Sequence, residues 1–585
     1  METLSSNNHL DELPASFCDI VLKGGITSGV VYPLALVELS KKFCFSNIGG
    51  TSAGAIAAAV AAAAEYGRSI PGAGFERLTQ IPNEIGPKLL SLFQPTQRLR
   101  PLFAIFSALL TAKSSVGRWG GILTAVVKGY PLAAILGVAP GILLAAIAWF
   151  GFASAGFLVS GIILSIVGLI VATFYRVIVA IRTALPANDF GLCPGIRQGG
   201  AKDEGFTDWL ARLIDEAAGV ANQDVPLTFG ALMVPPGDRS PIKLAMMTTS
   251  LMERRPYTLP FAHPRSFVFK RSEWTKLFPE RVMTYLVKNC ERFEQAAEEG
   301  DEYYLFPDAG HLPVIVAARM SLSFPGLICA VPLWRRDFTY ATEEEQNILR
   351  RCLFSDGGLS SNFPIHFFDR LLPNTPTFAI SLDRYDEKRD RGDSRVWLPL
   401  KAISGINIPI EPIEGILGFL MRLVDSAKDW QDNLQSTMPG YRERIVHIGL
   451  APEEGGLNLA MDNTTVQQLA EYGREAGDVL CTSFDLDEHR WRRFLVAMAR
   501  MEETLEEVVT AYQTLPGKPE GFDEFLKRYA DDPSSYRQDS KARLEVLLDR
   551  ARDLALLGEE WRGRPFIREG NIPKPDTDLR ITPKP

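Results

Sequence analysis

A serine in a Gly-x-Ser-x-Gly pattern is the first residue of this 585-residue sequence that could do chemistry. Ser52 stands between Gly50 and Gly54, after an apolar strand-like run and before an alanine-rich helix-like segment. A serine on a tight strand-to-helix turn is held with its hydroxyl exposed, and the flanking glycines let the backbone pass close by without a Cβ clash. The pattern therefore predicts a nucleophile at Ser52, with Gly50 and Gly54 supporting the turn.

An aspartate far along the chain is the second candidate. Asp356 ends a short apolar run and is followed by Gly357 and Gly358. Asp-Gly-Gly alone is most often a turn. Beside Ser52, however, Asp356 could accept the proton of the serine hydroxyl as a general base, and burial would assist by raising the pKa of the carboxyl. The two residues would form a Ser-Asp dyad, which needs no histidine, metal or cofactor.

Glycines near the N-terminus could stabilise the negative charge that such an attack creates. Gly24, Gly25 and Ile26 follow a strand-like run at residues 17–22 and precede a helix-like segment at residues 28–42. Backbone N–H groups that are free at the start of a helix suit a developing oxyanion. We therefore expect the oxyanion hole at Gly24, Gly25 and Ile26, with an ordinary tight turn between strand and helix as the alternative.

Strand-like and helix-like segments alternate around these residues, which predicts an α/β fold. Residues 17–66 read as strand, helix, strand and helix, the order that produces a parallel sheet with helices on its faces. Further strand-like runs lie at residues 227–233, 243–249 and 377–382, and helix-like runs at 206–217, 280–297 and 312–321. We expect the α/β layer to resume there, so that Asp356 can reach Ser52.

A hydrophobic insert separates the two parts of this layer. The 47 residues at 129–175 include no Asp, Glu, Lys, Arg or His, and one helix needs only roughly 20 residues to cross a bilayer core. Small residues at 151–156 divide the run, which predicts a transmembrane helical hairpin with spans near residues 130–150 and 157–175, inside an insert at 120–183. Alternatives are a hairpin that lies in the membrane interface, a lid over the site, or a helical pair buried in the soluble core.

The residues in and around the insert favour a membrane as its partner. Gly137 and Gly141 have the small-xxx-small spacing that lets two membrane helices approach closely. Residues 89–202 carry nine basic residues and one acidic residue, so this segment holds about +8 of a chain whose net charge is −8. Basic residues flank both ends of the hairpin, which places both ends, and the catalytic machinery, on the cytoplasmic side of the cytoplasmic membrane. A lipid surface suits such a segment better than nucleic acid.

Cysteine usage and the N-terminus agree with an intracellular location. The seven cysteines are scattered and form no Cys-x-x-Cys pair, so neither a disulfide framework nor a zinc site is predicted. The first residues are polar and include Asp11 and Glu12, unlike a secretory signal. We find no repeat, P-loop or nucleic-acid module.

Together these motifs resemble the patatin-like phospholipases, in the same order along residues 17–385. The matching stretches are the glycine-rich loop at 23–29, the pattern around Ser52, residues 318–325 with Val331-Pro332, and Asp356-Gly357-Gly358 followed by Asn362 and Pro364. The resemblance implies a three-layer α/β sandwich around a mainly parallel sheet and a bacterial, membrane-associated serine lipid acyl hydrolase. It also implies cleavage of fatty-acyl esters of membrane phospholipids by Ser52 and Asp356 through an acyl-enzyme.

The resemblance extends to the organisation of the chain. Residues 444–448 and the helical stretch to about 515 resemble bacterial membrane-associated members of the family, some of which have been linked to heat-shock regulation. We expect a polar tail (1–16), a patatin-like catalytic domain interrupted by the insert (17–455), a mostly helical C-terminal region (456–562) and an extended tail (563–585).

Two alternatives to this enzyme remain. The family's loop usually carries a third glycine and a basic residue where Ile26 and Ser28 stand, which keeps open a membrane-anchored scaffold or pseudoenzyme with a patatin-like fold. A Ser-His-Asp esterase is the other, because His447 and His489 follow Asp356 in the chain order of the α/β-hydrolases.

Overall fold

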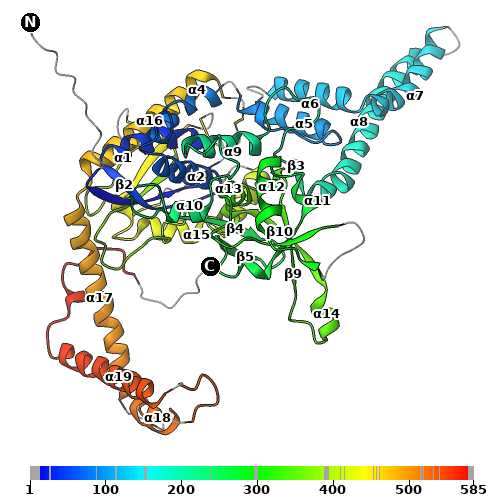
Figure 1. Ribbon diagram of the computed structural model, residues 1–585. Helices are drawn as coiled ribbons and strands as arrows, with labels where there is room; N and C mark the ends of the chain where they lie inside the picture. The colour runs from blue at the N-terminus through cyan, green and yellow to red at the C-terminus, as the bar shows by residue number, and fades with distance from the viewer. Residues whose placement is uncertain are drawn as a thin grey trace, which may run out of the picture.

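A mixed sheet of eleven strands lies at the centre of the protein in the computed structural model (Figure 1). The structure describes residues 14–577 except for residues 26–27, 87, 112–114, 151–154, 238, 295–300, 388–393, 409, 411, 414, 452–453, 456–457, 460, 514–516, 518–519, 531 and 539. Most of the predicted tail at residues 1–16 and the end of the tail at 563–585 therefore lie outside the described residues.

The sheet is mixed, with four parallel and six antiparallel strand pairings. From edge to edge its strands are β12 (Val396–Trp397), β13 (Ile445–Leu450), β11 (Thr377–Arg384), β1 (Ser16–Leu22), β2 (Phe43–Thr51), β4 (Lys243–Ser250), β10 (Leu349–Asp356), β9 (Val331–Arg336), β6 (Val268–Lys270) and β7 (Tyr303–Leu305), with β5 (Arg255–Leu259) also paired to β4. The run from β13 to β4 is parallel, and every other pairing is antiparallel. The expectation of a mainly parallel sheet is wrong, because short connections such as the one between β4 and β5 can only join antiparallel strands.

The N-terminal unit that carries the predicted nucleophile folds as expected. Strand β1 leads through a short 3-10 turn (Ser28–Val31) to α1 (Tyr32–Ser40), and β2 leads directly to α2 (Ala53–Tyr66). Nearly all alanines of α2 are buried, and the helix packs on β2, on α9 (Phe206–Ala217) and on α13 (Val314–Ser321). Small side chains let α2 approach the sheet closely, which holds the start of this helix in place.

Two segments differ from the elements predicted for them. Residues 227–233 are not a strand: they form α10 (Phe229–Met233), because the side chain of Thr228 accepts a hydrogen bond from Ala231 N–H and caps a helix there. The helix predicted at residues 280–297 is shorter: α12 (Glu280–Asn289) ends early, and Arg292 pairs with Tyr304 beside β7.

The opposite faces of the sheet are covered in different ways. Side chains such as Ile20 and Leu22 of β1 belong to the main core under the helices. Val21, which alternates with them, belongs to a second cluster that includes Phe363, Ile365 and Phe368. A segment that follows the predicted base thus covers the second face, close to α15 (Gly415–Thr437).

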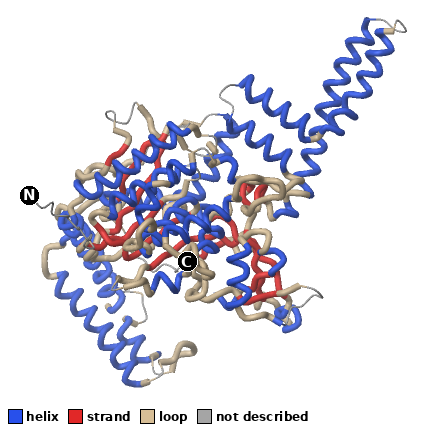
Figure 2. Tube along the Cα trace, turned by 45° about the horizontal axis from the view of Figure 1, so that its top comes forward, coloured by secondary structure: helices blue, strands red, loops and turns tan. Residues whose placement is uncertain are grey.

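Residues 100–183, which contain the hydrophobic insert, form four helices, and two of them project far from the sheet (Figures 1 and 2). They are α5 (Arg100–Thr111), α6 (Ser115–Gly129), α7 (Pro131–Trp149) and α8 (Ala155–Thr183). Helices α7 and α8 pack closely along their length. Glycine at positions 137 and 141 permits this approach, because a Cβ at Gly137 or Gly141 would overlap the backbone of α8. The residues at the tip, 151–154, lie outside the described residues.

One helix of the insert is long and apolar enough to cross a membrane by length and composition. This is the stretch Gly156–Thr183 of α8, whose apolar window is only 11% buried. A second span would require Trp119–Gly129 and Pro131–Ile147, which meet at 100°, to count as one broken span. Helices of this kind are weak support for a membrane, so the structure does not establish the two predicted spans.

The C-terminal part of the chain is mostly helical. Its helices are α16 (Asn463–Ser483), α17 (Leu486–Tyr512), α18 (Phe522–Tyr529) and α19 (Lys541–Arg562). Helix α16 packs against α1 in the layer over the sheet, whereas α17 leads to an arm in which α17 packs on α19 (Figure 1). The remaining elements are α3 (Gly74–Thr79), α4 (Ile81–Ile85), α11 (Arg271–Trp274), α14 (Glu343–Asn347) and the two-stranded sheet of β3 (Gly191–Cys193) and β8 (Gly326–Ile328).

Replacing Gly473 with alanine should destabilise the contact between α16 and α1. A Cβ at Gly473 would overlap the carbonyl oxygen of Val31, and overpacking of this kind costs about 1–3 kcal/mol. We expect a clearly lower melting temperature in thermal unfolding. Gly418→Ala in α15 is the control, since a Cβ there meets nothing within 4 Å; an equal loss in both variants would contradict the packing.

Candidate active site

Ser52 sits at the sharp turn between β2 and α2 in a strained backbone conformation. Its φ of 56° and ψ of −127° are unusual for a residue with a side chain. A Cβ at Gly50 would overlap the carbonyl oxygen of Gly54, and a Cβ at Gly54 would overlap that of Leu22. Both positions therefore require glycine, and together they hold Ser52 in the geometry of a nucleophile elbow.

The predicted base reaches this serine from the neighbouring part of the sheet. Ser52 Oγ donates a hydrogen bond of 2.8 Å to Asp356 Oδ2. Strand β4 lies between β2 and β10, with Met247 opposite Thr51 and Thr248 opposite Asp356. Ser52 directly follows β2 and Asp356 ends β10, so the two side chains meet across Met247 and Thr248 of β4.

Burial tunes Asp356 as a proton acceptor. The residue is only 3% exposed, and its burial raises the pKa of the carboxyl from 3.8 to about 6, although hydrogen bonds from Ser52 and Gly358 oppose the rise. Gly358 N–H donates to Asp356 Oδ1 at 2.7 Å, and the Thr249 hydroxyl donates to the Asp356 carbonyl oxygen at 2.9 Å. A carboxyl held this way is a base with a pKa near neutrality.

Gly357 and Gly358 allow a tight turn directly after Asp356, the last residue of β10. A Cβ at Gly357 would overlap the carbonyl oxygen of Met247, and one at Gly358 would lie 2.8 Å from Asp356 Oδ1. The backbone can therefore turn tightly enough for its own N–H to bond the carboxylate.

The stretch at residues 318–325 holds both members of the pair, a role that sequence reasoning did not assign to it. Ser52 N–H donates to Ser321 Oγ at 3.1 Å, and Asp356 N–H donates to the Ser323 carbonyl oxygen at 3.0 Å. Arg319 is fully buried and donates to Ser323 Oγ at 2.7 Å and to the Cys329 carbonyl oxygen at 2.9 Å. The buried guanidinium thereby fixes the turn after α13 against which nucleophile and base are placed.

The glycine-rich loop lies beside the nucleophile, but Gly24 does not offer its N–H group. A Cβ at Gly24 would lie 3.1 Å from Ser52 Cβ, which shows how close the loop comes. Gly24 N–H donates to the Asn362 carbonyl oxygen at 2.8 Å, so in this structure the predicted role of Gly24 as an oxyanion donor is not met. The N–H groups of Gly25 and Ala53 have no acceptor among the described residues, and Ile26 lies outside them.

Helix α15 contributes side chains that the sequence analysis missed. Asp432 accepts hydrogen bonds from Asn362 N–H at 2.6 Å and Phe363 N–H at 2.9 Å, so it holds the loop that follows the base. Lys428 lies near enough to lower the pKa of Asp356 slightly. A sequence pattern could have revealed this helix and its charged face. Charged residues recur there every three or four positions, at Asp425, Lys428, Asp429 and Asp432, which places them on one helix face.

The two histidines proposed for a Ser-His-Asp triad lie elsewhere. His447 Nδ1 is 2.5 Å from Asp383 Oδ2, and its ring stacks on Trp397 at 4.1 Å. His489 Nδ1 is 3.3 Å from Glu443 Oε1 in a buried position. Neither has a described contact with Ser52, whose side chain is bonded to Asp356. Within the described part of the chain, no group of His, Cys, Asp and Glu could hold a metal ion.

A narrow apolar pocket of about 80 Å³ opens next to the nucleophile. It begins at Ala53 and Gly29 and runs between α2, α4 and α9. Its lining is entirely apolar and includes Ile56, Val60, Phe93, Trp209, Leu322 and Phe324. Such a pocket suits a hydrocarbon chain and excludes charge.

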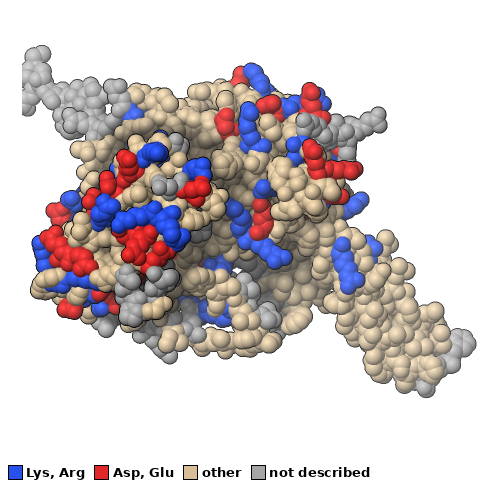
Figure 3. All heavy atoms as spheres, turned by 90° about the horizontal axis from the view of Figure 1, so that it is seen from below, with Lys and Arg blue, Asp and Glu red and all other residues tan. Residues whose placement is uncertain are grey.

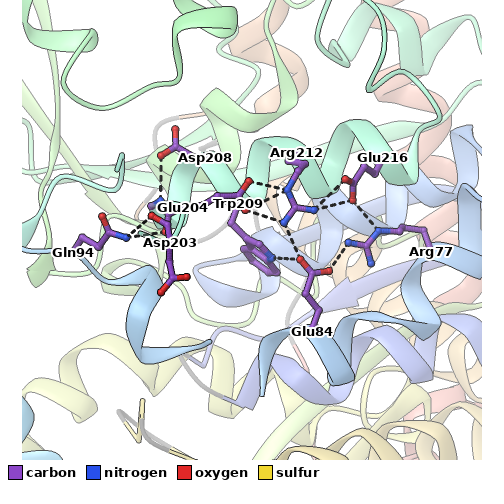
Figure 4. A network of polar contacts seen from close by, with 10 residues as sticks. Arg77, Glu84, Gln94, Asp203, Glu204, Asp208, Trp209, Arg212 and Glu216 are labelled. Carbon is purple, nitrogen blue, oxygen red and sulfur yellow. Dashed lines mark hydrogen bonds and ion pairs between the residues drawn. The ribbon is translucent and has the colours of Figure 1, made fainter. Parts of the chain in front are cut away.

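An ion-pair network braces the outer wall of this pocket (Figure 4). Glu84 of α4 accepts hydrogen bonds from Arg212 at 2.8 Å, from Arg77 at 2.5 Å and from the Trp209 indole at 3.1 Å. Although partial burial opposes it, bonding to Arg212 and Arg77 lowers the pKa of Glu84 to about 2. Glu216 joins the same two arginines from α9. The network ties α3 and α4 to α9 across the pocket that Trp209 lines.

Asp356→Asn should stabilise the protein above pH 6. Because the folded state raises the pKa of Asp356 to about 6, keeping the carboxylate ionised costs stability at neutral pH, and a pKa that is higher by one corresponds to roughly 1.4 kcal/mol. The gain in unfolding free energy should be absent below about pH 4, grow up to about pH 6 and then stay at about 2–3 kcal/mol.

Thermal unfolding at pH 4, 6 and 8 measures this effect. Asp478→Asn on the exposed face of α16 is the matched control and should show no such pH-dependent gain. Equal stability of Asp356→Asn and the wild type at every pH would refute the raised pKa.

Comparisons with known proteins give one relative along the whole chain. No protein-family model matches the sequence. The RpoH suppressor of Rhizobium meliloti (strain 1021) is 33% identical over 644 aligned positions, covering 97% of this chain and 99% of that protein.

Two solved structures align along most of the chain, but with low TM-scores. VipD from Legionella pneumophila has a TM-score of 0.31 and 13% identity, covering 94% of this chain and 85% of that one. ExoU of Pseudomonas aeruginosa, in complex with SpcU, has a TM-score of 0.22 and 15% identity, covering 94% and 78%. On the full-length match of sequence, the chain belongs to the family of the RpoH suppressor, and its elbow, its Asp-Gly-Gly base and its glycine-rich loop are patatin-like.

Proposed function

We propose that this protein is a serine lipid acyl hydrolase that cleaves fatty-acyl esters of membrane phospholipids. The observation that carries the proposal is the 2.8 Å hydrogen bond from Ser52 Oγ to a buried carboxyl whose pKa is about 6. A strained elbow on one side and a wholly apolar pocket on the other support it further. Together they suit an ester with a long hydrocarbon chain.

The reaction would proceed through an acyl-enzyme. Ser52 Oγ attacks the ester carbonyl carbon while Asp356 Oδ2 takes the hydroxyl proton. The N–H groups of Gly25 and Ala53, which stand next to the nucleophile, would bond the resulting oxyanion. Asp356 then returns the proton to the departing alcohol, a lysophospholipid. In the second half, Asp356 takes a proton from water, which attacks the acyl carbon. As the bond from that carbon to Ser52 Oγ breaks and the fatty acid leaves, Asp356 returns the proton to Ser52 Oγ.

The insert joins the body at the wall of the acyl pocket. Leu89 and Phe93 line the pocket just before α5 begins at Arg100. At the other end α8 leads to β3, which pairs with β8, and Ile328 of β8 also lines the pocket. Any membrane held by the insert would therefore lie on the path to the acyl site.

We further propose that α7 and α8 anchor the enzyme in the cytoplasmic membrane as two spans, with the catalytic domain on the cytoplasmic side. The outer part of the hairpin shows no charged side chain, and Lys and Arg gather only near its base (Figure 3). Its large apolar side chains are exposed, as Leu132, Leu136, Leu143 and Ile163 are by more than half. That exposure argues against a core helix and needs lipid or protein to cover it.

Ser52→Ala should lose both covalent labelling and hydrolysis. The wild type should react with a fluorophosphonate probe and release fatty acid from phospholipid vesicles, and removal of the nucleophile should lower the rate at least about 10³-fold. Because only ionised Asp356 is a base, kcat/KM should rise up to about pH 6 and level off above it.

Ser483→Ala on the exposed end of α16 is the control and should keep wild-type labelling and hydrolysis. A folded wild type that the probe does not label would favour the scaffold or pseudoenzyme instead, an alternative to which the engaged Gly24 N–H group gives some support.

Substitution of three exposed apolar residues of the hairpin by arginine should release the protein from membranes. Leu136→Arg, Leu143→Arg and Ile166→Arg each place a charge at an exposed position of α7 or α8, at about 2.5–3.5 kcal/mol each in a bilayer centre. We expect the share of protein in the carbonate-resistant membrane fraction to fall by more than half. Val234→Arg, at an exposed apolar residue outside the insert, should leave it unchanged. Retention of the triple variant in the membrane would contradict the spans.

A further inference from the structure

A second pocket, of opposite character, opens from the same glycine-rich loop. Its volume is about 430 Å³, and polar and charged residues line most of it. The lining includes Lys23, Asn362, Asp383, Trp397, Arg422 and Asp429. None of these side chains has a role in the hydrolysis proposed for Ser52 and Asp356.

The floor of this polar pocket is a connected set of side chains from three segments. Lys23 Nζ donates to Ser381 Oγ at 3.1 Å, to the Leu382 carbonyl oxygen at 3.3 Å and to Asp383 Oδ1 at 3.2 Å. Asp383 also binds His447 Nδ1, and the His447 ring is stacked beneath Trp397. Although desolvation opposes it, Lys23 and His447 hold the pKa of Asp383 below its usual range. The cluster is therefore held together before any ligand binds.

Only Gly24 separates the polar pocket from Ser52. Lys23 directly precedes Gly24, and a Cβ at Gly24 would overlap Asn362 Oδ1 on one side while lying 3.1 Å from Ser52 Cβ on the other. Asn362 lines the polar pocket, and Ala53, next to Ser52, lines the apolar one. An ester at Ser52 can therefore direct its acyl chain into one pocket and its alcohol part toward the other.

Groups of both charge signs line the polar pocket. Lys23, Arg384, Arg395 and Arg422 are cationic, and Asp383, Asp429 and Asp432 are anionic. A purely anionic ligand would suit only the first set and a purely cationic ligand only the second.

Two features favour an ammonium group as part of the ligand. Asp429 Oδ1 is buried and forms a long ion pair of 3.5 Å with Lys428 Nζ, but it accepts no hydrogen bond from the described residues. Trp397 is 41% exposed at the pocket, and an indole face attracts ammonium groups. A phosphodiester would then be bonded by the lysine and arginine side chains.

We propose that this pocket binds the head group of the phospholipid substrate, and that the head group is zwitterionic: a phosphodiester linked to an ethanolamine or choline ammonium. The inference rests on the proposed function of Ser52. The phosphate lies toward Lys23 and Arg422, and the ammonium lies between Asp429 and Trp397. The pocket thereby selects among lipids that share the same acyl chains.

The first test compares two lipids with identical acyl chains, phosphatidylethanolamine and phosphatidylglycerol, in mixed micelles with the full-length protein. The wild type should show about tenfold higher kcat/KM for phosphatidylethanolamine, and Asp429→Asn and Trp397→Leu should bring the ratio of the two kcat/KM values close to one. Asp478→Asn and Trp491→Leu, on exposed faces of α16 and α17, are matched controls and should keep the wild-type ratio. A wild type that hydrolyses both lipids equally, or an Asp429→Asn variant with an unchanged ratio, overturns the proposal.

The second test measures binding without catalysis, so that it stands apart from the proposed hydrolysis. The Ser52→Ala protein in non-ionic detergent is titrated with sn-glycero-3-phosphoethanolamine, glycerol 3-phosphate or ethanolamine while tryptophan fluorescence is followed. We expect a saturable change only with the first probe, and its loss when Trp397→Phe is added. No saturable change, or one that survives Trp397→Phe, overturns the head-group site even if hydrolysis is found.

The two tests together separate the lipid from a soluble ligand of the same chemistry. Binding of glycerophosphoethanolamine with no preference between the two lipids would mean that the pocket serves a water-soluble phosphodiester, and the proposal would fail. Absence of hydrolysis with specific binding would instead refute the function proposed for Ser52 and leave the zwitterion site intact.

Discussion

The hydrogen bond between Ser52 and Asp356 is the interaction on which the rest of the site depends. Its two side chains leave the ends of β2 and β10, and β4 between them sets their separation through its register with both strands. Ser321 at the end of α13 accepts a hydrogen bond from the Ser52 N–H group, and Ser323 in the turn that follows accepts one from the Asp356 N–H group. A strained serine and a buried carboxyl both cost stability, so the surrounding glycines, buried Arg319 and closely packed α2 must compensate for them.

Around this bond the protein separates apolar from polar surroundings. The pocket beside Ala53 is lined by apolar residues and is braced from outside by the Glu84 network. The pocket beside Lys23 is lined by charged residues of both signs, of which Lys23 and Asp383 form an ion pair. An amphipathic ester meets two complementary environments on either side of one serine. The chain leaves this pocket at Phe93 to enter the helices that lead to the hairpin, and after α8 it reaches β3, which pairs with β8 at the same pocket.

Much of the arrangement could be predicted because its signals are local. The glycines around Ser52 and after Asp356 mark places where the chain passes too close to its neighbours for a Cβ, and the alanines of α2 indicate close packing. The antiparallel part of the sheet was not predicted, since pairing direction depends on which strands meet and leaves little trace in any one of them. Helix α10 was missed because a single cap at Thr228 outweighed a strand-like composition. Helix α15 was overlooked although its charges recur at helical spacing.

By itself the sequence singled out Ser52, Asp356, the elbow glycines and a long uncharged insert, since each depends on residue type and short-range spacing. Only the tertiary structure decided that Gly24 N–H is engaged by Asn362, that Ser321 and Asp432 hold the loops, and that Lys23, Asp383 and His447 form one cluster. These contacts join residues far apart in the chain. Their distances follow from strand order and register, which no local pattern encodes.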